Sequence, residues 1–144
     1  MLKKMKLSIF SRIQNIDENG LPEGECERTD ESSIATVRLA DGEISISYKT
    51  LSEGAEIFTA YLLRGKELTV TRRGALNSTM VFSVGRTFNS VYEIPPYKFD
   101  MTVTAKRLSA SVTEQGGNID LLYEMTVGGA SKLCRMDIRL TEAK

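Results

Sequence analysis

The 144-residue chain contains no histidine and no tryptophan. Histidine is the commonest general base and a preferred zinc ligand, so Ser-His-Asp triads, Cys-His pairs and most zinc sites are excluded. The cysteines, Cys26 and Cys134, lie far apart and lack the spacing of metal ligands. In a reducing compartment such residues are free thiols, so we predict no disulfide, no metal site and no cofactor.

Net charge and long apolar runs are also missing. Nineteen basic and nineteen acidic residues give a formal charge of zero, which leaves no global positive field for nucleic acid or anionic lipid. No run approaches the roughly 18 consecutive apolar residues of a membrane helix. The lysines near the N-terminus precede alternating residues instead of the apolar stretch of an export signal. We therefore expect a cytoplasmic protein without nucleic-acid or membrane partners.

Catalytic motifs are equally scarce. Neither glycine-rich phosphate-binding sequence, G-x-x-x-x-G-K-[ST] or G-x-G-x-x-G, occurs. Alternation places Glu124 and Asp137 on a solvated outer face, and the acidic segment 17–31 is interpreted as a solvated loop because it lacks calcium-loop spacing. An enzyme would need titratable groups such as Glu93 or Asp100 to converge in a cleft. We predict no catalytic residue and rank an enzyme last.

What the chain does contain is alternation of apolar and polar residues with period two, interrupted repeatedly by Gly, Pro, Asn or Asp. This pattern predicts an all-β single domain over residues 1–144, an antiparallel up-and-down β-barrel of about eight to ten strands. Closure into a barrel would remove exposed sheet edges. A two-sheet sandwich is the alternative, and residues 51–63 could contain a helical turn.

The sequence also predicts particular turns and one irregularity in a strand. A loop is predicted over residues 15–24, and Asp41-Gly42 predicts a type I′ hairpin turn. The doublets Gly116-Gly117 and Gly128-Gly129 are interpreted as further hairpin turns. The apolar phase changes after Ala105, which indicates a β-bulge before Leu108.

The second half of the chain carries an ordered set of markers: Arg72-x-Gly74, Met80-Val81-Phe82 with Gly85, Tyr92 with Pro95, Phe99-x-Met101, Gly116-Gly117-x-Ile119-x-Leu121-x-Tyr123-x-Met125 and Met136-x-Ile138. In order and spacing this set resembles the YwiB-like family of bacterial proteins of unknown function. The resemblance implies a calycin or lipocalin-like barrel and a bacterial cytoplasmic setting, and it brings no catalytic residue. Residues 24–33 are more acidic than expected of that family, which leaves the pairing of the second strand open.

Arg72 is the residue that stands out. Alternation places it on the same face as Leu68 and Val70, inside the predicted barrel. A buried guanidinium needs an acceptor, because an unpaired charge in a dry interior is strongly unfavourable. The structural interpretation is a salt bridge with Glu25 or Glu27, or a rim position from which Arg72 reaches water.

The functional interpretation is that Arg72 binds the carboxylate or phosphate of a small amphiphilic or anionic ligand. The apolar body of that ligand would lie among Phe82, Tyr92, Phe99, Met101 and Tyr123, whose simpler interpretation is core packing. The leading function is thus a non-enzymatic ligand-binding barrel. The alternative is a filled barrel that acts as a structural or protein-interaction module, for example as a homodimer.

Overall fold

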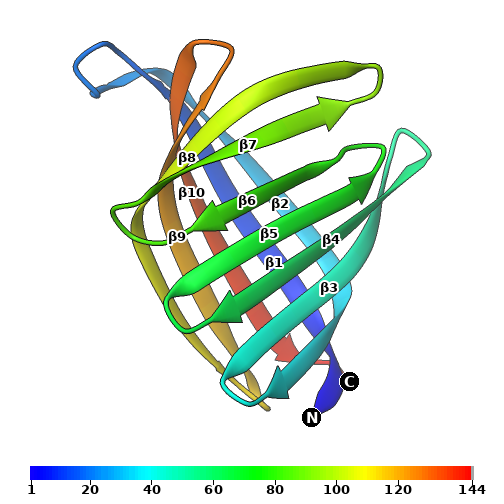
Figure 1. The fold of residues 1–144 in the computed structure, drawn as a ribbon. Coiled ribbons are helices and arrows are strands. Elements are labelled where there is room, and N and C mark those ends of the chain that lie inside the picture. The colour runs from blue at the N-terminus through cyan, green and yellow to red at the C-terminus, as the bar shows by residue number, and fades with distance from the viewer. Residues whose placement is uncertain (144) are drawn as a thin grey trace.

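The computed structural model describes residues 1–143, which form ten strands joined by short turns (Figure 1). The strands are β1 Leu2–Ile16, β2 Pro22–Ala40, β3 Glu43–Ser52, β4 Ala55–Arg64, β5 Glu67–Gly74, β6 Ser78–Phe82, β7 Thr87–Ile94, β8 Tyr97–Thr113, β9 Gly116–Val127 and β10 Ala130–Glu142. Alternating burial along most strands reflects the period of two seen in the sequence.

The strands form one antiparallel sheet in the order β6-β5-β4-β3-β2-β1-β10-β9-β8-β7. Apart from β6 and β7, strands adjacent in sequence pair with each other, and β1 pairs with β10 to wrap the sheet around (Figure 1). Among the described residues, β6 and β7 do not form a hydrogen-bonded ladder, and one backbone bridge between Asn77 and Glu93 joins them. The fold is a nearly closed up-and-down barrel, which confirms the predicted class and is not a two-sheet sandwich.

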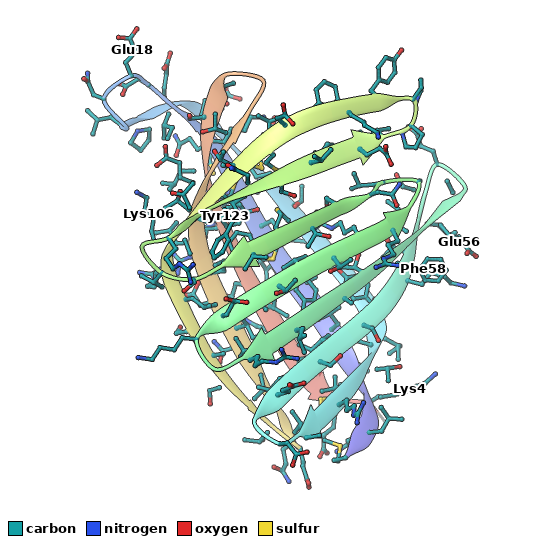
Figure 2. All side chains as sticks on the ribbon, in the orientation of Figure 1. Lys4, Glu18, Glu56, Phe58, Lys106 and Tyr123 are labelled. Atoms are coloured by element: carbon teal, nitrogen blue, oxygen red, sulfur yellow. The ribbon has the colours of Figure 1, made fainter. Side chains whose placement is uncertain are left out.

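The barrel has two distinct ends. Both termini lie at one end, together with the β2–β3, β4–β5, β6–β7 and β8–β9 turns (Figure 1). We call this the terminal end. The hairpin end carries the other five turns, and there the β1–β2 hairpin projects beyond the barrel, with Glu18 near its tip (Figure 2).

Two predicted turns and the predicted bulge are confirmed. Asp41 and Gly42 have φ values of 48° and 80°, as a type I′ turn requires, and Gly128-Gly129 connects β9 to β10. A register shift between Ala105 and Arg107 is the β8 bulge. The helical turn considered within residues 51–63 is wrong, because those residues form parts of β3 and β4 joined by a tight turn.

The interpretation of Gly116-Gly117 as a turn is also wrong. Both glycines begin β9, and the turn lies just before them. Gly117 pairs with Val112 on β8 and Leu140 on β10, and a Cβ added to it would lie 1.9 Å from the Ser111 carbonyl oxygen. The glycine is therefore required by close approach of a neighbouring strand.

The predicted loop over residues 15–24 is shorter than expected, because β1 extends to Ile16 and β2 starts at Pro22. The Asp17 carboxylate accepts hydrogen bonds from the backbone N–H groups of Asn19 and Leu21, each at 2.9 Å, and so fixes the turn. Most of the acidic segment is part of β2 and pairs with β1. The interpretation of 17–31 as a solvated loop is corrected, and the pairing of the second strand is settled.

The inner face of the barrel is a continuous apolar core. Its most deeply buried side chains have less than 2% exposure: Tyr61, Phe82, Met5, Leu7, Ile46, Leu68, Met101, Ile119, Leu121, Ile138, Val37 and Val70. Outward residues on the same strands, such as Phe58, remain exposed (Figure 2). Near the hairpin end the inner face changes from apolar to polar, and this change positions the candidate site.

Candidate functional site

A row of polar side chains crosses the inner face of four neighbouring strands. The register places Tyr48 on β3 opposite Thr59 on β4, Thr59 opposite Arg72 on β5, and Arg72 opposite Ser78 on β6. Tyr48, Thr59 and Ser78 are 7%, 3% and 6% exposed. Arg72 therefore points inward, as alternation predicts, and its cross-strand neighbours are buried hydroxyl groups.

These strands border an interior cavity of about 270 Å³ near the hairpin end. Its wall combines two arginines, one carboxylate, several hydroxyls and a group of sulfur-containing side chains. The lining residues are Ser11, Ile13, Thr29, Glu31, Arg72, Met80, Tyr92, Met101, Tyr123, Met125, Cys134, Arg135 and Met136.

Four of the six predicted ligand-contact residues, Arg72, Tyr92, Met101 and Tyr123, meet at this cavity. The other two do not line it. Phe82 is 1% exposed and packs behind the wall, with its ring centroid 4.6 Å from that of Tyr123. Phe99 is 44% exposed and lies opposite Tyr92 near the turn between β7 and β8, beyond the cavity.

The predicted salt bridge between Arg72 and Glu25 or Glu27 is wrong. Both glutamates are exposed, on the part of β2 that extends toward the projecting hairpin. Among residues 1–143, no carboxylate forms an ion pair with Arg72. Arg72 is therefore a partly buried cation that lines the cavity without forming an ion pair in this part of the chain.

The carboxylate that does share the cavity is Glu31, which sequence reasoning missed. It lies opposite Ile9 and has the same inward phase as Ala35 and Val37. Counting back by two from Ala35 would have found it. The apolar residues that mark the inner face of β2 begin only at Ala35, after Glu31 in the sequence, and this concealed the position of Glu31.

Tyrosine hydroxyls surround the guanidinium. The Tyr48 and Tyr61 hydroxyl oxygens lie 3.3 Å apart, and the Tyr61 hydroxyl donates to the Met136 sulfur at 4.0 Å. Burial raises the pKa of Tyr48, Tyr61 and Tyr123 above the ordinary tyrosine value. All of them are therefore protonated at neutral pH and offer dipoles, not counter-charges.

Arg72 itself stays charged. Burial acts to lower its pKa, but the oxygens of Tyr61, Tyr48 and Tyr123 more than offset this, and the pKa lies above its ordinary value. Cys134, also at the cavity, has its pKa raised to about 11 by burial, so its thiol is protonated at neutral pH. The charged side chains at the cavity are therefore Arg72, the Glu31 carboxylate and Arg135, which pairs with Asp120 at 3.7 Å. The cationic group available to an anion there is the guanidinium of Arg72, which forms no ion pair among the described residues.

The other candidate carboxylates lie outside this site. Glu124 and Asp137 form ion pairs with Lys106 at 3.5 Å and Arg139 at 3.1 Å. Glu93 pairs with Lys98 at 3.4 Å. The described residues contain no group of three or more His, Cys, Asp or Glu side chains placed to hold a metal ion. Within residues 1–143 no helix has the length and apolar character needed to cross a membrane.

Comparison with solved structures gives a strong match to one titled "Crystal structure of ywiB protein from Bacillus subtilis". The TM-score is 0.86 at 20% sequence identity, over 99% of this chain and 94% of that chain. At this identity the likeness shows the fold alone. Among curated proteins, no sequence relative matches.

A family match covers most of the chain. Residues 15–140 match the family described as "Domain of unknown function (DUF1934)". The match includes β2 to β9 in full and the inner-face residues that line the cavity on those strands. The chain therefore belongs to this family of unknown function, in agreement with the resemblance to YwiB-like proteins that its ordered sequence markers indicate.

Proposed function

We propose that this protein is a non-enzymatic, calycin-like barrel of the bacterial cytoplasm that binds a small anionic or amphiphilic molecule in its interior. In this proposal Arg72 receives the acidic group of the ligand. The observation that carries it is the inward guanidinium, which faces a cavity of about 270 Å³ and has no ion pair among the described residues.

Arg72 is a partly buried charge without an ion pair in the described part of the chain. A cation removed from water without an acceptor destabilises the fold. A carboxylate or phosphate can satisfy a guanidinium with two parallel hydrogen bonds, which makes arginine well suited to such groups. A ligand would therefore stabilise a charge that the protein leaves unpaired.

The cavity also limits the ligand. Its volume lies just below the range of about 300–1,000 Å³ that is typical of small-molecule sites. The methionines Met80, Met101 and Met136 offer an adaptable apolar surface beside Arg72. We infer a compact ligand that combines one acidic group with a short apolar or aromatic body.

The test is a titration with 4-fluorobenzoate followed by ¹⁹F NMR. Wild-type protein should bind it, and Arg72→Met should weaken binding by at least about tenfold because a hydrogen-bonded charge pair is lost. Arg73→Met is the matched control, because Arg73 is the next residue on β5 and is exposed on the outer face. Equal binding by Arg72→Met and wild type, or no binding of 4-fluorobenzoate, hexanoate or phenyl phosphate by wild type, would contradict the proposal.

A protein-interaction role, for example as a homodimer, is the second candidate. It is supported by Ile34 and Phe58, which are 52% and 51% exposed beside a shallow outer hollow of about 360 Å³. Sedimentation of wild type and of Phe58→Ser tests it. A dimer that Phe58→Ser dissociates would favour this role, and a monomer at all concentrations would remove the homodimer.

A further inference from the structure

The gap in the barrel lies between β6 and β7, and we call it the seam. At the hairpin end, the backbones of Asn77 and Glu93 exchange two hydrogen bonds of 2.8 Å each. Further along, the Ser90 hydroxyl donates to the Thr79 carbonyl. Among residues 1–143 no β-ladder joins β6 to β7 (Figure 1). The seam is therefore the least firmly bonded part of the barrel wall.

The two strands are nevertheless in phase with each other. If the Asn77–Glu93 register continued along both strands for two residues, away from the hairpin end, Thr79 would lie opposite Val91. Both residues are exposed. Thr79 and Val91 would then lie together on the outside. The seam can consequently widen or close without turning any side chain to the opposite face.

A hollow of about 810 Å³ runs along the seam, with side chains from both strands in its wall. Arg72 lines this hollow and also lines the interior cavity. It is the residue common to the two spaces. Arg72 thus borders both the outer hollow along the seam and the interior cavity, on either side of the wall next to β6.

Ser78 provides an independent observation at the same place. It is 6% exposed, lies directly opposite Arg72 in the register, and lines the seam hollow. Its hydroxyl oxygen is buried and has no hydrogen-bond partner among the described residues. Buried hydroxyls are normally satisfied, so this donor lacks an acceptor next to a cation that has no carboxylate partner within residues 1–143. A single anionic oxygen group could accept from both.

We propose that the seam is the entrance through which an anion reaches Arg72, and that Ser78 donates a second hydrogen bond to the bound anion. This inference rests on the proposed function, because it takes Arg72 as the anion-binding residue. Since the Ser78 oxygen is inaccessible with the seam as it stands, the seam widens as the anion enters. The Asn77–Glu93 bridge remains at the hairpin end and limits the opening.

The role of Ser78 is tested by equilibrium binding of 4-fluorobenzoate. Ser78→Ala should weaken binding by about tenfold, as expected for loss of a hydrogen bond to a charged group. Ser47→Ala is the matched control, because Ser47 is exposed on the outer face of β3. Affinity unchanged in Ser78→Ala would overturn this part of the inference.

The entrance is tested by exchange rates, measured from ¹⁹F line shapes. Ser90→Ala removes the hydrogen bond from the Ser90 hydroxyl to the Thr79 carbonyl and should speed association and dissociation several-fold. A second variant carries Thr79→Cys and Val91→Cys in a Cys26→Ser background, so that the two new cysteines can be cross-linked by a disulfide or a short bis-maleimide. The cross-link should slow association and dissociation at least tenfold. Because an entrance changes rates and not equilibrium, the dissociation constant should change little in either case. Unchanged rates in both variants would show that the anion enters elsewhere.

These results separate the two proposals. If wild type binds the probe and Arg72→Met does not, while the Ser78 and seam variants behave as wild type, only the present inference fails. If wild type binds none of the probes, the proposed function fails.

Discussion

The two ends of the barrel interior differ although the same strands build them. At the terminal end, one cross-strand row consists of Ile44, Leu63, Leu68 and Phe82. Four residues away on each strand, toward the hairpin end, the matching row is Tyr48, Thr59, Arg72 and Ser78. Alternation directs both rows inward. Strand periodicity thus decides where a side chain points, and residue type decides whether a barrel end is filled with apolar side chains or kept polar around a cavity.

The largest loss of stability is expected from a substitution at the terminal end. Gly117→Ala should lower the free energy of unfolding by about 4 kcal/mol, because its Cβ would collide with the Ser111 carbonyl oxygen and force β8 and β9 apart. Urea denaturation measures it. Asn118→Ala, at the next and exposed position of β9, is the control and should change stability by less than about 0.5 kcal/mol. A stable Gly117→Ala variant would contradict the packing described here.

Removing a core side chain should have the next largest effect. Leu68 is fully buried at the terminal end, so Leu68→Ala should cost about 3 kcal/mol through lost burial and a residual cavity. Leu51 is 69% exposed, and Leu51→Ala serves as the control in the same denaturation experiment. Similar losses in the two variants would show that the terminal end is not tightly packed.

Alkaline pH should lower the stability of the fold through buried thiol and hydroxyl groups near the hairpin end. Burial raises the pKa of Cys134 from its ordinary 9.0 to about 11, so the folded state keeps a proton that the unfolded state releases. Stability contributed by this group is complete below pH 9 and is lost as pH rises toward 11, by about 2 kcal/mol. The raised pKa values of the three buried tyrosines extend the loss above pH 10. Cys134→Ala should flatten the part of the profile between pH 9 and 11, and an unchanged slope would contradict the assignment.

The smallest effect on stability is expected at Arg72. Since the guanidinium has no ion pair among residues 1–143, Arg72→Met should leave stability unchanged or raise it by about 1 kcal/mol. Arg73→Met should have an effect within about 0.5 kcal/mol. A large loss of stability in Arg72→Met would indicate a structural role and weaken the contrast between the two ends.

Much of the fold could be predicted because its signals are local. Alternation predicted the inward direction of Arg72, and the phase change after Ala105 predicted the β8 bulge. Asp41-Gly42 predicted its turn because both positions need positive φ.

The errors arise where distant neighbours decide the structure. Gly117 is required by Ser111 on another strand, which no local pattern around the glycine doublet reveals. The part of β2 before Glu31 extends toward the projecting hairpin and has no deeply buried face, so it lacks apolar alternation and resembles a loop. The same loss of pattern led to Glu25 and Glu27 as partners of Arg72 and concealed Glu31.

The central claim, that Arg72 receives the acidic group of a ligand inside the barrel, is tested most directly by NMR of the arginine side chains. The Nε–H signal of Arg72, assigned by its loss in Arg72→Met, should shift on titration with 4-fluorobenzoate, while that of Arg73 stays in place. An unmoved Arg72 signal at saturating probe, or shifts confined to outer-face arginines such as Arg12 and Arg28, would contradict the account.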